Sequence, residues 1–241
     1  MDETEIPPPP WRRSMAGRPS RAARTPLSRD EIIRAGLRIV AAEGIDAVSM
    51  RRLAAEFDTG PSSLYAHVAN KDELLQLMFD EICGEVPIPE IDPERWQEQM
   101  KQIARDAYRV MTRYGDIARA ALATIPVGPK ALRVSEAMLA MMVAGGLDPA
   151  TAGWALDRLF LYITADAYEG AIFEARFKSA EEVQAYWEEF GEQLATYYES
   201  LPEDRFPNLR AHARSLIGGG REERFEFGLD MLIDGLARHR R

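Results

Sequence analysis

The stretch that decides the fold is Gly60–Leu75, GPSSLYAHVANKDELL. Pro61 follows a glycine, and proline is favoured at the first position of a helix because its missing N–H has no partner there. Asn70 and Glu73 then have the spacing of a capping box, which begins another helix. The stretch therefore predicts a short helix with polar outer side chains, a turn, and a longer apolar helix.

The residues before this stretch predict two more helices. Ser28 and Glu31 have capping-box spacing, and the apolar pattern that follows them ends at Gly44. Ser49 is the expected cap of a second, short helix. This helix and the one after Pro61 are each about two turns long with a tight turn between them, which is the proportion of a helix-turn-helix. Asp58 lies in that turn, where a left-handed backbone is often needed.

The rest of the chain is also helical in pattern. The segment Gly84–Pro93 contains three prolines and separates a first unit from a larger body. Body helices are expected from Asp92-Pro93, over 129–144, from Asp148-Pro149, from Ser179 and near the C-terminus, with a looser stretch over 201–221. No segment alternates long enough to predict a strand. The expected fold is all-α, with a disordered basic arm (1–27), a helix-turn-helix domain (28–86) and a helical ligand-binding and dimerisation domain (92–241).

Composition limits the kind of protein. Of 241 residues, 46% are hydrophobic and 29% charged, which is ordinary for a globular protein. No apolar run approaches the roughly 18 residues of a membrane span. The single cysteine, Cys83, excludes an internal disulfide and a multi-cysteine zinc site. We therefore expect a cytoplasmic protein without a membrane partner, metal site or cofactor.

The charge of the chain is unevenly distributed. The whole chain carries a net charge of −9, but residues 11–71 hold eleven Lys and Arg against six Asp and Glu. A basic front and an acidic rear are typical of a nucleic-acid-binding head on a body that does not touch the polyanion. The alternative is a random scatter of charge.

The outward side chains of the two short helices are candidates for DNA contacts. Short polar groups can reach base edges in the major groove, and cationic groups can reach phosphates. The candidates are Arg51, Ser62, Ser63, Tyr65, His67 and Lys71. Five arginines of the arm, Arg12, Arg13, Arg18, Arg21 and Arg24, could follow the DNA backbone or a minor groove. Alternatively, Tyr65 packs against the next helix, His67 satisfies a helix carbonyl, and the arm only aids solubility.

These residues together resemble the N-terminal domain of the tetracycline-repressor (TetR) family. The resemblance rests on Glu43-Gly44, Leu53-Ala54, Leu64-Tyr65-Ala66-His67, and Asn70-Lys71 with Leu74-Leu75, about 50 residues in all. The closing segment, Phe225–His239, is similar to the last helix of the tetracycline-repressor subgroup.

The resemblance implies a homodimer that represses transcription from a pseudo-palindromic operator and is released by a small molecule. It places the six candidates above at DNA-contacting positions. It also implies a dimeric four-helix bundle made by the last helix and the helix after Asp148, with Gly228 and Gly235 allowing close approach. The alternatives are an activator or a ligand-independent DNA-binding protein. An enzyme is not expected, because the three histidines are scattered and no hydrolase or metalloprotease motif is present.

The candidate ligand pocket is rich in aromatic residues and methionine. Its members are Trp96, Met100, Tyr108, Met111, Met138, Met142, Trp154, Tyr162 and Phe173, and Glu169 matches an acidic position of the subgroup. Such side chains can line an adaptable apolar cavity, although each can equally be plain core. The chain has no histidine between His67 and His212, so recognition of a tetracycline–magnesium complex is not expected. The expected effector is largely hydrophobic or aromatic.

Overall fold

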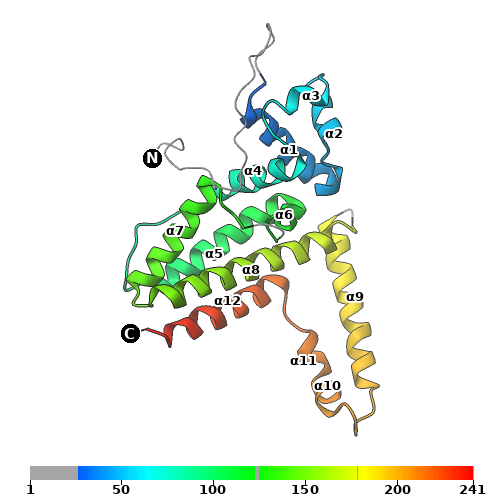
Figure 1. The fold of residues 1–241 in the computed structure, drawn as a ribbon. Helices are drawn as coiled ribbons and strands as arrows, with labels where there is room; N and C mark the ends of the chain where they lie inside the picture. The colour runs from blue at the N-terminus through cyan, green and yellow to red at the C-terminus, as the bar shows by residue number, and fades with distance from the viewer. Residues whose placement is uncertain (1–26, 123–124, 178, 241) are drawn as a thin grey trace.

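The structure is a computed structural model that describes residues 27–122, 125–177 and 179–240 (Figure 1). Throughout these ranges the chain is helical and contains no strand, which confirms the all-α prediction. The expected basic arm with its five arginines lies outside the described residues, except for Leu27.

The N-terminal head is built from three helices and the start of a fourth. They are α1 (Arg29–Glu43), α2 (Met50–Ala55), α3 (Pro61–Leu64) and α4 (Lys71–Cys83), with a 3-10 turn η2 (Ile45–Ala47) after α1. As the sequence predicted, three side chains accept hydrogen bonds from backbone amides at the starts of α1, α2 and α4. They are those of Ser28, Ser49 and Asn70. Leu53, Ala54 and Leu64 are fully buried between the helices.

The body consists of the remaining helices. They are α5 (Trp96–Arg113), η3 (Gly115–Ile117), α6 (Ala118–Leu122), α7 (Pro129–Ala144), α8 (Pro149–Glu174), α9 (Ala180–Glu199), α10 (Pro207–Ala211), α11 (Ala213–Ile217) and α12 (Arg221–Ala237). The long helix α8 packs on α5, α6, α7 and α12. Figure 1 shows α9 leaving the end of α8 and turning away from the body, with α10 and α11 folded back along it.

Two predicted boundaries were wrong. Helix α5 begins at Trp96 rather than at Pro93, because the Asp92 side chain accepts the Glu94 amide at 3.0 Å and its carbonyl accepts the Arg95 amide, which closes a turn instead. The stretch 201–221 is not loose. It contains α10, which begins at Pro207, and α11, which ends before Gly218, and both helices pack on α9.

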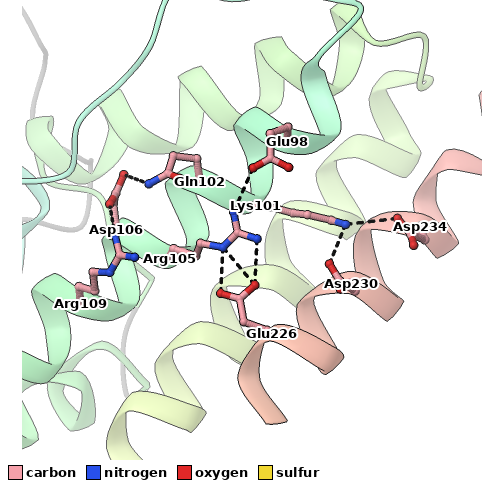
Figure 2. Close-up of polar contacts among 9 residues, drawn as sticks. All are labelled: Glu98, Lys101, Gln102, Arg105, Asp106, Arg109, Glu226, Asp230 and Asp234. Carbon is pink, nitrogen blue, oxygen red and sulfur yellow. Dashed lines mark hydrogen bonds and ion pairs between the residues drawn. The ribbon is translucent and has the colours of Figure 1, made fainter. Parts of the chain in front are cut away.

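Ion pairs join α12 to α5 (Figure 2). The Lys101 ammonium lies 2.7 Å from an Asp230 oxygen, and the Arg105 guanidinium lies 2.8 Å from Glu226. Because these pairs hold the acidic face of α12 against α5, other side chains of α12 are left outside. Phe227 is 66% exposed and Met231 is 60% exposed.

The two glycines of α12 have different surroundings. A Cβ atom on Gly228 would lie 2.3 Å from the Tyr162 hydroxyl, so this glycine admits a side chain of α8 in the same chain. A Cβ atom on Gly235 would meet nothing within 4 Å. Both glycines were expected to allow close approach of a helix from a second copy of the chain. Of the two, only Gly235 has open space beside it.

Candidate nucleic-acid interface and ligand cavity

The turn between α2 and α3 has the helix-turn-helix geometry. Asp58 has φ 48°, and among the described residues it is the only non-glycine residue with a positive φ. The Thr59 amide donates to the Ala54 carbonyl at 3.2 Å, and the hydroxyls of Thr59 and Ser63 lie 2.9 Å apart. The predicted left-handed position is therefore present, and Asp fills it because its short polar side chain tolerates this conformation better than most residues do.

Most of the predicted DNA-contacting side chains are exposed on the head. Ser62, Ser63 and Tyr65 are exposed, Tyr65 by 45%, and His67 is half-buried. Arg51 is also exposed, whereas its neighbour Arg52 pairs with Glu43 at 2.7 Å.

Lys71 is the first residue of α4 and is half-buried beside η2. Its ammonium lies 3.4 Å from the Ile45 carbonyl. A cation at the beginning of a helix, where backbone amides are free, is an arrangement that can hold a phosphate.

The head is joined to the body through η2, a connection that sequence reasoning missed. The Asp116 carboxylate accepts the Ile45 amide at 2.8 Å, and the Arg119 guanidinium lies 2.9 Å from Asp46. Asp116 lies in η3 and Arg119 in α6. A pair of residues more than 70 positions apart leaves no periodic signal in one sequence, so nothing in the sequence indicated this contact.

A second connection runs between α4 and the start of α7. Asp80 is only 8% exposed, and its carboxylate accepts the Ala131 amide at 2.9 Å. Lys130 pairs with Glu81 at 2.6 Å. A carboxylate at a helix N-terminus satisfies a free amide and interacts favourably with the helix dipole, so α4 and α7 are held together at this point.

A cavity of about 240 Å³ lies between α4, α5, α7 and α8. Its walls are mostly apolar, and two of the predicted pocket residues, Met111 and Met138, line it. The complete lining is Phe79, Ile82, Cys83, Val86, Ala107, Val110, Met111, Ile125, Pro126, Ala131, Val134, Ser135, Met138, Gly153, Leu156, Asp157, Phe160 and Ile163.

The other predicted pocket residues lie elsewhere. Trp96, Met100 and Met142 are buried in the core by packing between helices. Tyr108 and Tyr162 flank Phe225 with ring centroids 4.2 and 5.4 Å away, and the Tyr162 hydroxyl donates to the Phe225 carbonyl at 2.8 Å. Trp154, 72% exposed, and Glu169 lie on the outside of α8. Phe173 contacts Trp187 of α9.

Sequence reasoning missed the cavity wall supplied by α4. Phe79, Ile82 and Cys83 follow the apolar spacing of an ordinary packing face, which gives no sign that part of this face borders a cavity. Burial, together with the negative charge of Asp80, raises the pKa of the Cys83 thiol to about 12, against a smaller opposing effect of Arg133.

The described part of the chain contains neither a cluster of metal ligands nor a helix that could span a membrane. Within the described ranges, His, Cys, Asp and Glu side chains form no group of three or more that could hold a metal ion. In the same ranges, every helix is too short or too polar to span a bilayer.

Comparison with known proteins identifies the family. The sequence pattern of the "Tetracyclin repressor-like, C-terminal domain" matches residues 88–240, and that of "Bacterial regulatory proteins, tetR family" matches residues 32–78. The structure of ActR from Streptomyces coelicolor in complex with actinorhodin is 39% identical, covers 90% of this chain and 98% of its own, and has a TM-score of 0.81.

Two curated relatives agree. The HTH-type transcriptional repressor DrrR1 of Streptomyces coeruleorubidus is 28% identical over 91% of this chain and 80% of its own length. The class G tetracycline repressor protein of Vibrio anguillarum is 27% identical over 90% of this chain and 96% of its own. With both parts of the chain matched, and with a helix-turn-helix head joined to a helical body, this protein belongs to the TetR family of bacterial transcriptional regulators.

Proposed function

We propose that this protein is a repressor that binds a pseudo-palindromic operator as a homodimer and leaves it when a hydrophobic or aromatic small molecule fills the cavity. One observation carries the proposal: α4 forms a wall of the cavity at Phe79, Ile82 and Cys83, and the same helix begins at Lys71 on the DNA-facing side of the head. A molecule in the cavity therefore touches the element that supports the head.

The DNA contacts follow from the exposed face of α2 and α3. Ser62, Ser63 and Tyr65 are short or amphipathic groups suited to base edges and sugar edges in the major groove. Arg51 reaches a guanine or a phosphate, and Lys71 with the α4 amides holds a phosphate. His67 lies three residues after the end of α3, in the turn before α4, and contacts the DNA backbone in this proposal.

The homodimer is supported by the apolar residues that α8 and α12 leave outside. Trp154 on α8 and Phe227 and Met231 on α12 are each at least 60% exposed. Large apolar side chains gathered on two adjacent helices indicate a protein interface. Pairing of these helices with those of a second copy gives the four-helix bundle that the resemblance implies.

Release from DNA requires that the effector bind more tightly to the dimer with one separation of the two heads than to the dimer with the other separation. A dimer reads half-sites about 34 Å apart, so a swing of each head breaks simultaneous docking. The contacts of Asp80 with Ala131 and of Asp116 with Ile45 make the head follow the body rather than move independently.

The effector class follows from the cavity lining, which is apolar on α4, α5 and most of α7 and α8. The related ActR has been solved in complex with actinorhodin, which supports a small-molecule effector for this body. The pocket residues proposed here are therefore the lining set, which includes Met111 and Met138. The remaining predicted ligand residues act as supporting core or as surface.

A gel-shift experiment tests the proposal. Labelled intergenic DNA next to the gene of this protein is incubated with it at about 150 mM salt, with excess unrelated DNA as competitor, since DNA affinity depends on salt. We expect a specific protein–DNA complex. Addition of a hydrophobic aromatic compound, for example actinorhodin, should dissociate this complex. Absence of a specific complex would overturn the proposal. If the protein instead increased transcription from the bound promoter in a purified system, it would be an activator and not a repressor.

A further inference from the structure

We propose that Asp80 couples the ligand cavity to the DNA-facing head. Its carboxylate caps α7 when the head is in the position that binds the operator, and a molecule in the cavity competes with this cap. The inference rests on the proposed function, because it names the residue through which the same cavity regulates DNA binding.

Helix α7 takes its N-terminal cap from another helix. The residue at its own cap position is Gly128, which has no side chain, and the Ala131 amide in the first turn donates to the Asp80 carboxylate at 2.9 Å. Capping side chains normally come from the residue just before the helix. Because Asp80 belongs to α4 and is buried, a buried hydrogen bond to a charged group joins α4 to the start of α7.

Gly128 leaves the space that this approach needs. A Cβ atom on Gly128 would overlap the carboxyl group of Asp80, including the Oδ1 atom that accepts the Ala131 amide. A side chain at position 128 would therefore push the Asp80 carboxylate away from α7. The cap can thus be broken from either side, by a change at Asp80 or by a change at Gly128.

The cap lies at the edge of the cavity. Ala131, which donates the hydrogen bond, and Phe79, which precedes Asp80, both line the cavity of about 240 Å³. The cap draws the α4 wall and the α7 wall together at this edge. A molecule that inserts between Phe79 and Ala131 must move these walls apart, so filling this part of the cavity and keeping the cap oppose each other.

A second, smaller hollow of about 30 Å³ also borders the cap. Asp80, Gly128 and Ala131 are among its lining residues. A hollow of this volume with polar groups in its wall admits a water molecule. Water can therefore bind the carboxylate and the amide when they separate, so the cap can open without leaving either group unsatisfied in the interior.

Helix α4 carries the opening of the cap to the head. Lys71 is the first residue of α4, and Asp80 lies about 13 Å further along the axis at the rise of an α-helix. A shift of Asp80 relative to α7 therefore changes the position of Lys71 relative to the body. An effector shifts an equilibrium only through its preference for one state, and competition with the cap supplies that preference.

Hydrogen exchange tests the coupling without an effector. Exchange of the Ala131 amide is measured by NMR in the full chain, free and bound to its operator. Operator binding should slow this exchange several-fold, because opening the cap then also weakens the bound DNA, and such coupling is reciprocal. The control is the Thr151 amide, which donates to Asp148 at 3.2 Å in a cap made within α8 alone. Its exchange should not change.

Two variants break the cap in different ways. Asp80→Ala removes the carboxylate, and Gly128→Ala displaces it. Each should weaken operator binding about tenfold, which corresponds to about 1.4 kcal/mol. Each should also bind 2-naphthalenemethanol, a neutral aromatic probe, several-fold more tightly, because the probe no longer competes with the cap. Asp80→Asn, which keeps an acceptor oxygen, should give intermediate values.

The matched control is Asp148→Ala. It removes the capping carboxylate of α8, which lies outside the cavity lining and outside α4. It should therefore change neither the operator affinity nor the probe affinity. Circular dichroism checks that every variant keeps native helix content.

Four results are decisive. Equal exchange of the Ala131 amide with and without operator, or native operator affinity in both Asp80→Ala and Gly128→Ala, overturns the inference. Weaker binding of both operator and probe in both variants also overturns it, because Asp80 would then have a structural role alone. If the native chain binds no operator specifically, the proposed function fails instead. If the probe binds no form of the chain, the proposed effector class fails for this cavity, and the exchange of Ala131 alone decides the inference.

Discussion

The Asp116 carboxylate accepts a hydrogen bond from the Ile45 amide at 2.8 Å, and the Ile45 carbonyl lies 3.4 Å from the Lys71 ammonium. One peptide segment of η2 thus connects a side chain of the body to a side chain proposed to hold a phosphate. This segment therefore links the body to the surface that we propose to face DNA.

Removing this contact should weaken operator binding without affecting the dimer. Asp116→Ala loses a part-buried hydrogen bond, worth about 1 kcal/mol, so the head is less well positioned and operator affinity should fall about fivefold. The Ile45 amide should also exchange with solvent faster in hydrogen-exchange measurements. Arg109→Ala is the control, because Arg109 pairs with Asp106 within α5 alone. Equal exchange at Ile45 in Asp116→Ala and the native chain would contradict the assigned contact.

Two single substitutions test the DNA-facing surface. Tyr65→Ala and Lys71→Ala should each weaken operator binding while leaving the dimer intact. Loss of a phosphate contact at Lys71 should also reduce the slope of log affinity against log salt by about one. Fluorescence anisotropy with labelled operator at several salt concentrations measures both effects.

The control for these substitutions is Tyr197→Ala, which removes a 59% exposed tyrosine from α9, far along the chain from the head. Its operator affinity should equal that of the native chain. If both Tyr65→Ala and Lys71→Ala kept native affinity and native salt dependence, the proposed docking of α3 would be wrong.

The buried carboxylate of Asp80 should contribute to stability. Asp80→Ala leaves the Ala131 amide without its acceptor in a buried place, which should lower the free energy of unfolding by about 1–3 kcal/mol. Urea unfolding followed by circular dichroism measures the change. Asp72→Asn, at an exposed position in the first turn of the same helix, should change the free energy by less than about 1 kcal/mol.

The sequence predicted local features of this protein better than long-range ones. Caps at Ser28, Ser49 and Asn70 and the left-handed residue Asp58 were predictable because their causes lie within four residues of chain. Two of the predicted pocket residues line the cavity. The others, such as Trp96, have the same periodicity as cavity residues but face other helices, and only tertiary packing separates the two groups.

The Cys83 thiol should react slowly while the protein is folded. With its pKa raised to about 12, the folded thiol at pH 8 holds roughly a thousandth of the thiolate of an unfolded chain, whose thiol has a pKa near 8.5. Alkylation by iodoacetamide should therefore be slower in buffer than in urea by a factor on the order of a thousand. Because the chain has one cysteine, the rate of mass increase reports this residue alone.

The same shift predicts a pH dependence of stability. A thiol whose pKa is raised on folding favours the folded state fully below its unfolded pKa, and this contribution is lost as pH rises from about 8.5 to about 12. Cys83→Ala should therefore reduce the decline in the free energy of unfolding over this range. An identical decline in the variant and the native chain would assign it to other groups, for example Tyr162, whose pKa burial also raises to about 12.

The exposed aromatic residues of α8 and α12 should control assembly. Trp154→Glu or Phe227→Glu places a charge where a second copy is proposed to pack, and burial of an unpaired charge costs several kcal/mol. Each variant should be a folded monomer with native helix content, measured by light scattering and circular dichroism. A monomer presents one head to a two-part operator, so it should lose nearly all specific binding. Tyr197→Glu, at a position on α9 that is 59% exposed, should remain dimeric, and monomers in that variant alone would place the interface on α9 instead.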